Sequence, residues 1–89
     1  MVRRTVTFEG RVQGVGFRYA VLGSVRGTAV TGYVRNLPGE DVEAVFEGEP
    51  AAIDAVLARV RERMAGHIDA ERTDEGPATR EFRDFSIRR

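Results

Sequence analysis

Apolar and polar residues alternate in two stretches of the chain, residues 5–9 and 42–47, and this spacing predicts half-buried strands. Residues 28–35 are rich in β-branched and aromatic side chains, which favour a strand. The Pro-Gly pair at residues 38–39 marks a turn, so residues 28–35 and residues 42–47 are expected to form a hairpin. The side chains expected to face the core are Val6, Phe8, Val42, Ala44 and Phe46.

Two other segments carry apolar residues at helical spacing. The first begins at Phe17 and ends before Gly27, although Gly23 inside it weakens a helix by up to about 1 kcal/mol relative to alanine. The second begins at Pro50, whose missing N–H costs nothing at a first helical position, and ends before Gly66. Its expected buried stripe consists of Ile53, Val56, Leu57, Val60 and Met64.

The pattern is weaker after the second helix. Residues 67–72 predict a weak strand, residues 74–79 a polar loop and residues 83–87 a short final strand. The order strand, helix, strand, strand, helix, strand is typical of the split βαβ, or ferredoxin-like, arrangement. We therefore expect an α+β sandwich in which an antiparallel sheet carries two helices on one face.

The composition fits one globular domain over residues 1–89, with 42% hydrophobic and 31% charged residues. Fourteen arginines balance fourteen acidic residues and there is no lysine, so the basic excess of a nucleic-acid binder is missing. The absence of cysteine excludes disulfides and thiolate chemistry. No apolar run reaches the roughly 18 residues of a membrane span, and no apolar stretch follows the basic residues 1–4. We expect a cytoplasmic protein.

A glycine-rich loop, residues 10–16, connects the first strand to the first helix. Glycines allow successive backbone N–H groups to point into one concavity, and the positive end of the helix dipole adds to their attraction for an anion. Arg18 follows in the first helical turn, where its guanidinium can form paired hydrogen bonds to phosphate. The loop is neither a dinucleotide fingerprint, because residue 19 is Tyr19, nor a P-loop. By itself it could equally be a turn that packs helix against strand.

Asn36 ends the second strand, in the segment Gly-Tyr-Val-Arg-Asn at residues 32–36. An asparagine in this place is common in ordinary turns, because its side chain tolerates turn conformations well. Taken alone, it does not distinguish a turn residue from a site residue.

The two segments together resemble the signatures of the acylphosphatase family, and the likeness extends over nearly the whole chain. The first signature is matched at Gly10, Val12, Gln13, Gly14, Val15, Phe17 and Arg18, and the second at Gly32, Tyr33, Val34, Arg35 and Asn36. The resemblance implies a ferredoxin-like α/β sandwich and hydrolysis of the carboxyl–phosphate anhydride of small acyl phosphates.

The resemblance also implies roles for individual residues. Arg18 binds the substrate phosphate and Asn36 positions the attacking water, while backbone amides hold the phosphate oxygens. The substrate-binding set is Gln13, Gly14, Val15, Gly16, Phe17 and Arg18. Two departures from the family pattern are the turn glycine Gly39, which arrives one position early, and Gly23 in the first helix.

The residue types suit a reaction that needs no acid, metal or cofactor. The carboxylate leaving group has a conjugate acid of pKa roughly 4 and leaves without protonation. His67, the only histidine, belongs to neither motif, and no acidic cluster has the spacing of metal ligands. Asn36 can orient a water but cannot act as a base, so a phosphate oxygen of the substrate is expected to take the proton.

Other readings stay open at this stage. The chain could be a non-catalytic phosphate-binding regulatory module of the same fold, or resemble the acylphosphatase-like domain of larger carbamoyl-phosphate-handling maturation proteins. RNA binding is disfavoured, because residues 42–47 carry acidic side chains where an RNA-recognition strand needs basic and aromatic ones. We expect a monomer that binds a small acyl phosphate, with no nucleic-acid or membrane partner.

Overall fold

The computed structural model describes every residue from Met1 to Arg89. Its elements follow the expected order, including the short final strand at the C-terminal end. They are β1 (Val2–Gly10), α1 (Phe17–Val25), β2 (Thr31–Asn36), β3 (Val42–Gly48), α2 (Pro50–Arg63), β4 (Ile68–Pro77) and β5 (Phe85–Arg88). Neither helix is long and apolar enough to span a membrane.

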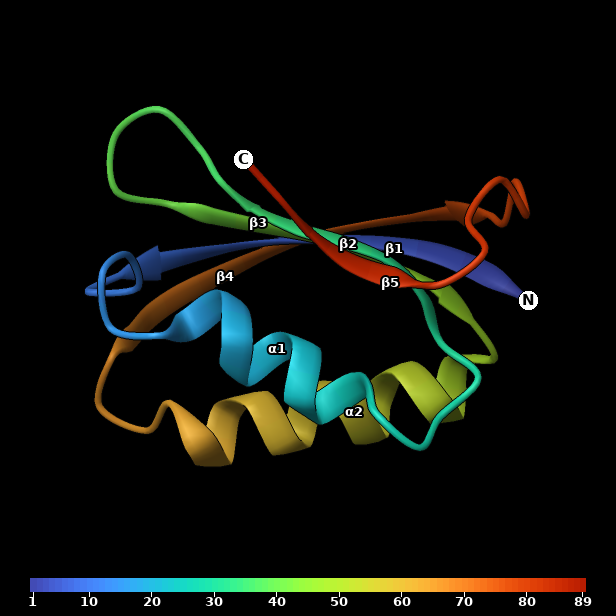
Figure 1. Ribbon diagram of the computed structural model, residues 1–89, viewed down its shortest axis with the longest axis horizontal. Coiled ribbons are helices and arrows are strands. Elements are labelled where there is room, and N and C mark those ends of the chain that lie inside the picture. The colour runs from blue at the N-terminus through green and yellow to red at the C-terminus, as the bar shows by residue number, and fades with distance from the viewer.

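The five strands form one sheet in the order β4-β1-β3-β2-β5, and both helices cover the same face of it (Figure 1). β1, β3, β2 and β4 pair antiparallel, as expected. β5, however, pairs parallel with β2, so the sheet is mixed and the expectation of a purely antiparallel sheet is wrong at this edge. The long connection after β4 brings the chain back across the sheet before β5 begins, and this return sets the parallel direction.

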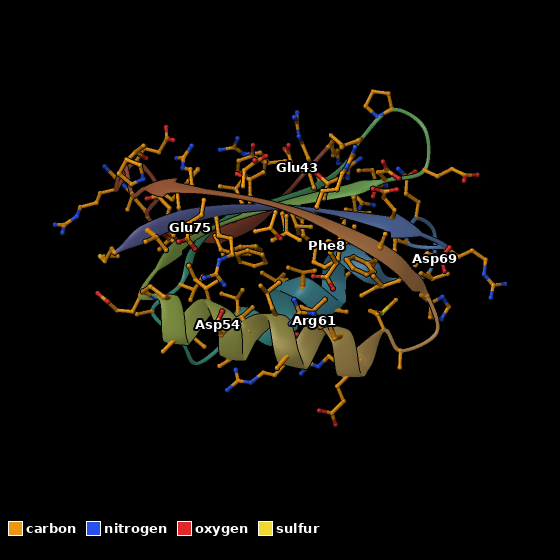
Figure 2. All side chains as sticks on the ribbon, turned by 180° about the vertical axis from the view of Figure 1, so that it is seen from behind. Phe8, Glu43, Asp54, Arg61, Asp69 and Glu75 are labelled. Atoms are coloured by element: carbon orange, nitrogen blue, oxygen red, sulfur yellow. The ribbon has the colours of Figure 1, made fainter.

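The core lies between the sheet and the two helices. All five inward strand residues and all five residues of the α2 stripe are buried, as the spacing predicts. Figure 2 shows Phe8 between the sheet and the helices and Glu43 on the opposite, open face of the sheet. A Cβ at Gly23 would meet only the guanidinium of Arg63, the end of a flexible side chain that can move aside, so the structure gives no steric reason for a glycine inside α1.

The ten-residue strand β4 differs most from expectation. It pairs with β1 from Ile68 to Pro77, so the predicted polar loop at residues 74–79 is mostly strand. Two of its four acidic side chains are paired with arginines of the neighbouring elements: Arg61 of α2 bonds Glu71 at 2.8 Å, and Arg4 of β1 bonds Glu75 at 2.8 Å. A strand held by ion pairs at a sheet edge lacks the apolar alternation from which strands are predicted.

On the open face, the connection between β4 and β5 is held by one carboxylate. Glu47 of the central strand β3 is 1% exposed and accepts hydrogen bonds from the amides of Thr79, at 2.9 Å, and Arg80, at 2.8 Å. Arg3 Nε donates to the same carboxylate at 2.7 Å. Burial by itself would raise the pKa of Glu47, but these donors outweigh it and lower the pKa to about 2.

Candidate active site

The glycine-rich loop is fixed at its two ends by buried side chains. Val12 and Phe17 are each 1% exposed, whereas Gly14, Val15 and Gly16 between them are exposed. The ring of Phe17 packs against Phe8 of β1, with 4.9 Å between ring centroids. The loop therefore projects from the core between two anchors, and the start of α1 is fixed above the inner face of the sheet.

The backbone amides of this loop are free to bind an external acceptor. Gly16, the residue before α1, has φ 77°, a left-handed conformation that glycine adopts without strain, and no side chain caps the helix. Ala20 donates the first helical hydrogen bond, to Gly16 O at 3.0 Å. No amide of residues 12–19 donates a hydrogen bond within the protein. This is the arrangement of an anion site at a helix N-terminus.

Arg18 is the cation nearest this end of the helix in sequence. It lies in the first turn of α1, next to the buried Phe17, and is half-buried. Seven of the fourteen arginines pair with a carboxylate or a carbonyl, whereas Arg18 forms no ion pair and no hydrogen bond in the protein. Its five N–H donors are therefore available to a ligand.

Asn36 approaches the same place from the sheet. On β2, Gly32, Val34 and Asn36 face the helices, and Asn36 pairs with Val42, which in turn pairs with Phe8. An apolar side chain would continue the core in this position. Instead, the Asn36 side-chain oxygen is buried and has no hydrogen-bond partner in the protein. A buried polar atom without a partner is costly, so this atom is a candidate acceptor for a bound molecule.

Loop, helix and strand meet in a hollow of about 110 Å³. It brings together five of the seven predicted site residues; Gln13 and Val15 instead face a second hollow, of about 410 Å³, on the other side of the loop. Tyr19 also lines the first hollow, 71% exposed, and was missed because an exposed tyrosine on a short helix carries no signal in sequence. The lining of the first hollow is Val12, Gly14, Gly16, Phe17, Arg18, Tyr19 and Asn36.

The early turn glycine does not disturb Asn36. Gly39 adopts φ 92°, and the turn closes with a hydrogen bond from the Leu37 amide to the Asp41 carbonyl at 2.9 Å. The side chain of Gln13 reaches this turn from the loop and donates to both Leu37 O, at 2.9 Å, and Asp41 O, at 2.8 Å. The Gln13 side chain thus contacts the hairpin and not the hollow.

His67 contacts the loop from outside the hollow. Its ring Nδ1 lies 3.2 Å from the carbonyl oxygen of Arg11, and its own carbonyl accepts the Arg11 amide at 3.0 Å. Nowhere in the chain do three histidine or acidic side chains come together in a way that could hold a metal ion. The hollow therefore presents amides, one guanidinium and one side-chain amide, a donor set suited to a phosphate group.

Comparison with known proteins agrees with this geometry. The acylphosphatase family model matches residues 4–87. The chain belongs to the acylphosphatase family. An acylphosphatase of Geobacter sulfurreducens is 36% identical over 88 residues, which cover 98% of this chain and 97% of that protein. One of Rubrobacter xylanophilus is 39% identical over 87 residues, which cover 97% and 79%. The family predicted from the two motifs, a family of hydrolases, is confirmed.

Solved structures confirm the ferredoxin-like α+β fold. The crystal structure of acylphosphatase from Bacillus subtilis superposes with a TM-score of 0.90 at 28% identity and covers the whole of both chains. A structure of full-length HypF in a phosphate- and nucleotide-bound form matches with a TM-score of 0.85 at 29% identity. That match covers 98% of this chain but only 12% of HypF, so it is a likeness to one domain of a much longer protein.

Proposed function

We propose that this acylphosphatase-family chain hydrolyses small acyl phosphates to a carboxylate and inorganic phosphate, and that Arg18 and Asn36 act directly on the substrate. The observation that carries the proposal is the hollow in which an unpaired guanidinium, a row of free amides and a buried, partnerless amide oxygen converge. The guanidinium and the amides are donors without an acceptor, which a phosphate would supply. The amide oxygen is an acceptor without a donor, which a water molecule would supply.

Binding of the phosphate group comes first. The free amides of the loop and of the first turn of α1 donate to its oxygens, and Arg18 forms paired hydrogen bonds to two of them. As the bond to the leaving group breaks, charge shifts among the phosphate oxygens, and donors already fixed in place stabilise that charge without reorganisation. The anchoring of the loop by Val12 and Phe17 provides this fixed geometry.

Asn36 then orients the attacking water. Its side-chain oxygen accepts a hydrogen bond from the water and holds the water in line with the leaving oxygen. The water oxygen forms a bond to phosphorus, the bond from phosphorus to the acyl oxygen breaks, and the electron pair leaves with the carboxylate. The proton of the water passes to a phosphate oxygen, so the products are a carboxylate and dihydrogen phosphate.

This scheme requires no general acid, no general base and no metal ion. The leaving carboxylate is stable without a proton, because its conjugate acid has a pKa of roughly 4. The hollow contains no acidic or histidine side chain. We therefore expect turnover to survive EDTA and to gain nothing from added Mg²⁺ or Zn²⁺.

Hydrolysis of benzoyl phosphate in the presence of EDTA tests the proposal. The expected result is release of benzoate and phosphate by the wild-type protein well above the uncatalysed rate, and its loss in Arg18→Ala. Phosphate binding without turnover would instead identify a non-catalytic anion-binding module. Turnover that disappears with EDTA and returns with a metal ion would overturn the metal-free scheme.

Three finer expectations belong with this proposal. We propose a monomeric, cytoplasmic protein that has a small acyl phosphate, and no nucleic acid or membrane, as its partner. The formal net charge of zero supports the absence of nucleic-acid binding. Light scattering coupled to size-exclusion chromatography tests the monomer, and fractionation of cells that express the whole gene tests the location.

A further inference from the structure

Gln13 connects the anion-binding loop to the strand that carries Asn36. Its Nε2 atom donates to Leu37 O at 2.9 Å and to Asp41 O at 2.8 Å, so both N–H bonds of the side-chain amide are used. The two acceptors lie 24 and 28 residues further along the chain. No other side-chain hydrogen bond joins residues 10–18 to β2, to β3 or to the turn between them.

The two carbonyls stand at the two ends of the turn that follows Asn36. Leu37 is the next residue after Asn36, and its amide already bonds the Asp41 carbonyl at 2.9 Å. The Gln13 amide closes this pair into a three-membered set, in which Gln13, Leu37 and Asp41 are each bonded to the other two. The backbone that carries Asn36 is therefore tied to the loop that carries the free amides.

We propose that Gln13 is a positioning residue, which fixes Asn36, and so the attacking water, in line with a phosphate held by the loop. This inference rests on the proposed function. Asn36 lies at the last position of β2, where the pairing with β3 ends, so its place is not fixed by the sheet on both sides. Beyond Asn36 the hairpin is held by the Leu37–Asp41 bond, and the Gln13 bonds add a second constraint there, from the same segment that holds the phosphate.

This arrangement separates positioning from binding. The Gln13 side chain does not line the hollow that Arg18 and Asn36 share, and the loop keeps its two buried anchors, Val12 and Phe17, without it. Removal of the side-chain amide should therefore lower kcat and leave phosphate affinity intact. A displacement of about 1 Å in an attacking group can cost on the order of 100-fold in rate, so we expect kcat to fall about 10- to 100-fold.

A double-mutant cycle tests the inference, with benzoyl phosphate as substrate. Gln13→Met keeps the length of the side chain and removes both donors, and it is made in the wild type and in Asn36→Ala. If Gln13 acts through Asn36, Gln13→Met should lower kcat strongly in the wild type and by no more than about twofold in Asn36→Ala. Arg61→Ala is the matched control, because it also removes two side-chain hydrogen bonds, those to Glu71, away from the site.

Each outcome decides the question. Equal losses of kcat from Gln13→Met in both backgrounds, or none in the wild type, would overturn the positioning role. A parallel rise in KM and in the Kd for inorganic phosphate would also overturn it, because Gln13 would then support the phosphate site itself. Circular dichroism and thermal melting identify a variant that has merely unfolded, and Gln13→Ala then replaces Gln13→Met. Failure of the proposed function is distinct, since the wild type itself would release no benzoate.

Discussion

The polar groups at the two ends of the sheet differ in whether they have hydrogen-bond partners within the protein. Around Glu47 on the open face, a fully buried carboxylate is bonded to two backbone amides, a hydroxyl and a guanidinium. At the start of α1, backbone amides, the Arg18 guanidinium and the Asn36 oxygen all remain without partners in the protein. The first group is complete within the fold and stabilises it. In the second group the buried Asn36 oxygen lacks a partner, which costs stability, and the proposed function assigns the missing partners to a bound ligand.

The largest expected effect is on the unpaired cation. Arg18→Ala should lower kcat/KM about 1000-fold, because a single arginine that stabilises a transferring phosphoryl group is typically worth that much or more. The melting temperature should stay near that of the wild type, since Arg18 forms no internal bond to lose. Initial rates with benzoyl phosphate and thermal denaturation measure the two quantities.

Arg18→Lys refines the same prediction. A lysine keeps the charge but cannot form the paired, planar hydrogen bonds of a guanidinium, so it should recover little activity. Full activity of Arg18→Lys would remove the guanidinium geometry from the mechanism and leave only a requirement for charge.

The complete group should respond in the opposite way. Glu47→Ala leaves Arg3 and two amides without their acceptor, and we expect it to lower the free energy of unfolding by about 3 kcal/mol. The kcat of the molecules that remain folded should be unchanged. Urea denaturation and active-site-normalised rates measure the two. The exposed partner of Arg3, Glu81, provides the control, because an exposed ion pair contributes little and Glu81→Gln should leave the free energy of unfolding nearly unchanged.

The same carboxylate gives stability a pH dependence. The pKa of Glu47 is lowered from 4.5 to about 2 on folding, so Glu47 contributes its full stability above pH 4.5. As the pH falls from about 4.5 towards 2, the unfolded state binds the proton first, and on the order of 3 kcal/mol is lost. Glu47→Gln should remove most of this dependence. A variant that keeps the wild-type acid transition would show that other carboxylates control it.

Asn36→Ala should give a smaller effect than the arginine and none on stability. We expect kcat to fall about 100-fold, as when one oriented donor or acceptor is removed from a transition state, with little change in phosphate affinity. The fold should be as stable as the wild type or more so, because the substitution removes a buried oxygen that has no partner. A destabilised variant with normal kcat would mean that Asn36 serves the hairpin and not the water.

Of these two regions, only the one at the start of α1 could be recognised from the sequence. The loop at residues 10–16 and Asn36 each lie in a short motif of neighbouring residues. The fold, the family and most of the hollow could therefore be predicted. In the sequence, Glu47 has the position of an ordinary solvent-facing residue in an alternating strand. Its partners Thr79 and Arg80 lie about thirty residues away and give no local signal. Nothing in the local pattern indicates that the chain returns over that face.

The misjudged elements have related physical causes. β4 carries charges at half of its ten positions. It is an edge strand that arginines of β1 and α2 help to hold, and a charged edge strand resembles a loop in sequence. The parallel pairing of β5 with β2 depends on the path of the preceding connection, and hydrophobic spacing carries no information about that path. The bonds from the Gln13 side chain to the hairpin were not predicted, because only the folded chain creates them; the backbone amide of Gln13, the group expected to bind phosphate, has no partner in the protein.

The smallest expected effect uses inorganic phosphate to fill the incomplete group. A ligand that binds only the folded state at roughly ten times its Kd stabilises it by about 1.4 kcal/mol, which should raise the melting temperature of a domain this small by several degrees. Sulfate should act similarly at the site, and chloride at matched ionic strength much less.

Because sulfate and phosphate also stabilise proteins by exclusion from their surfaces, the increment in melting temperature is compared with that in Arg18→Ala. The specific increment should largely vanish there, while the general salt effect remains and while Glu81→Gln, on the opposite face, keeps both. Equal phosphate stabilisation of wild type and Arg18→Ala would show that the free donors at the start of α1 are not the anion site, and the assignment of Arg18 would have to be abandoned.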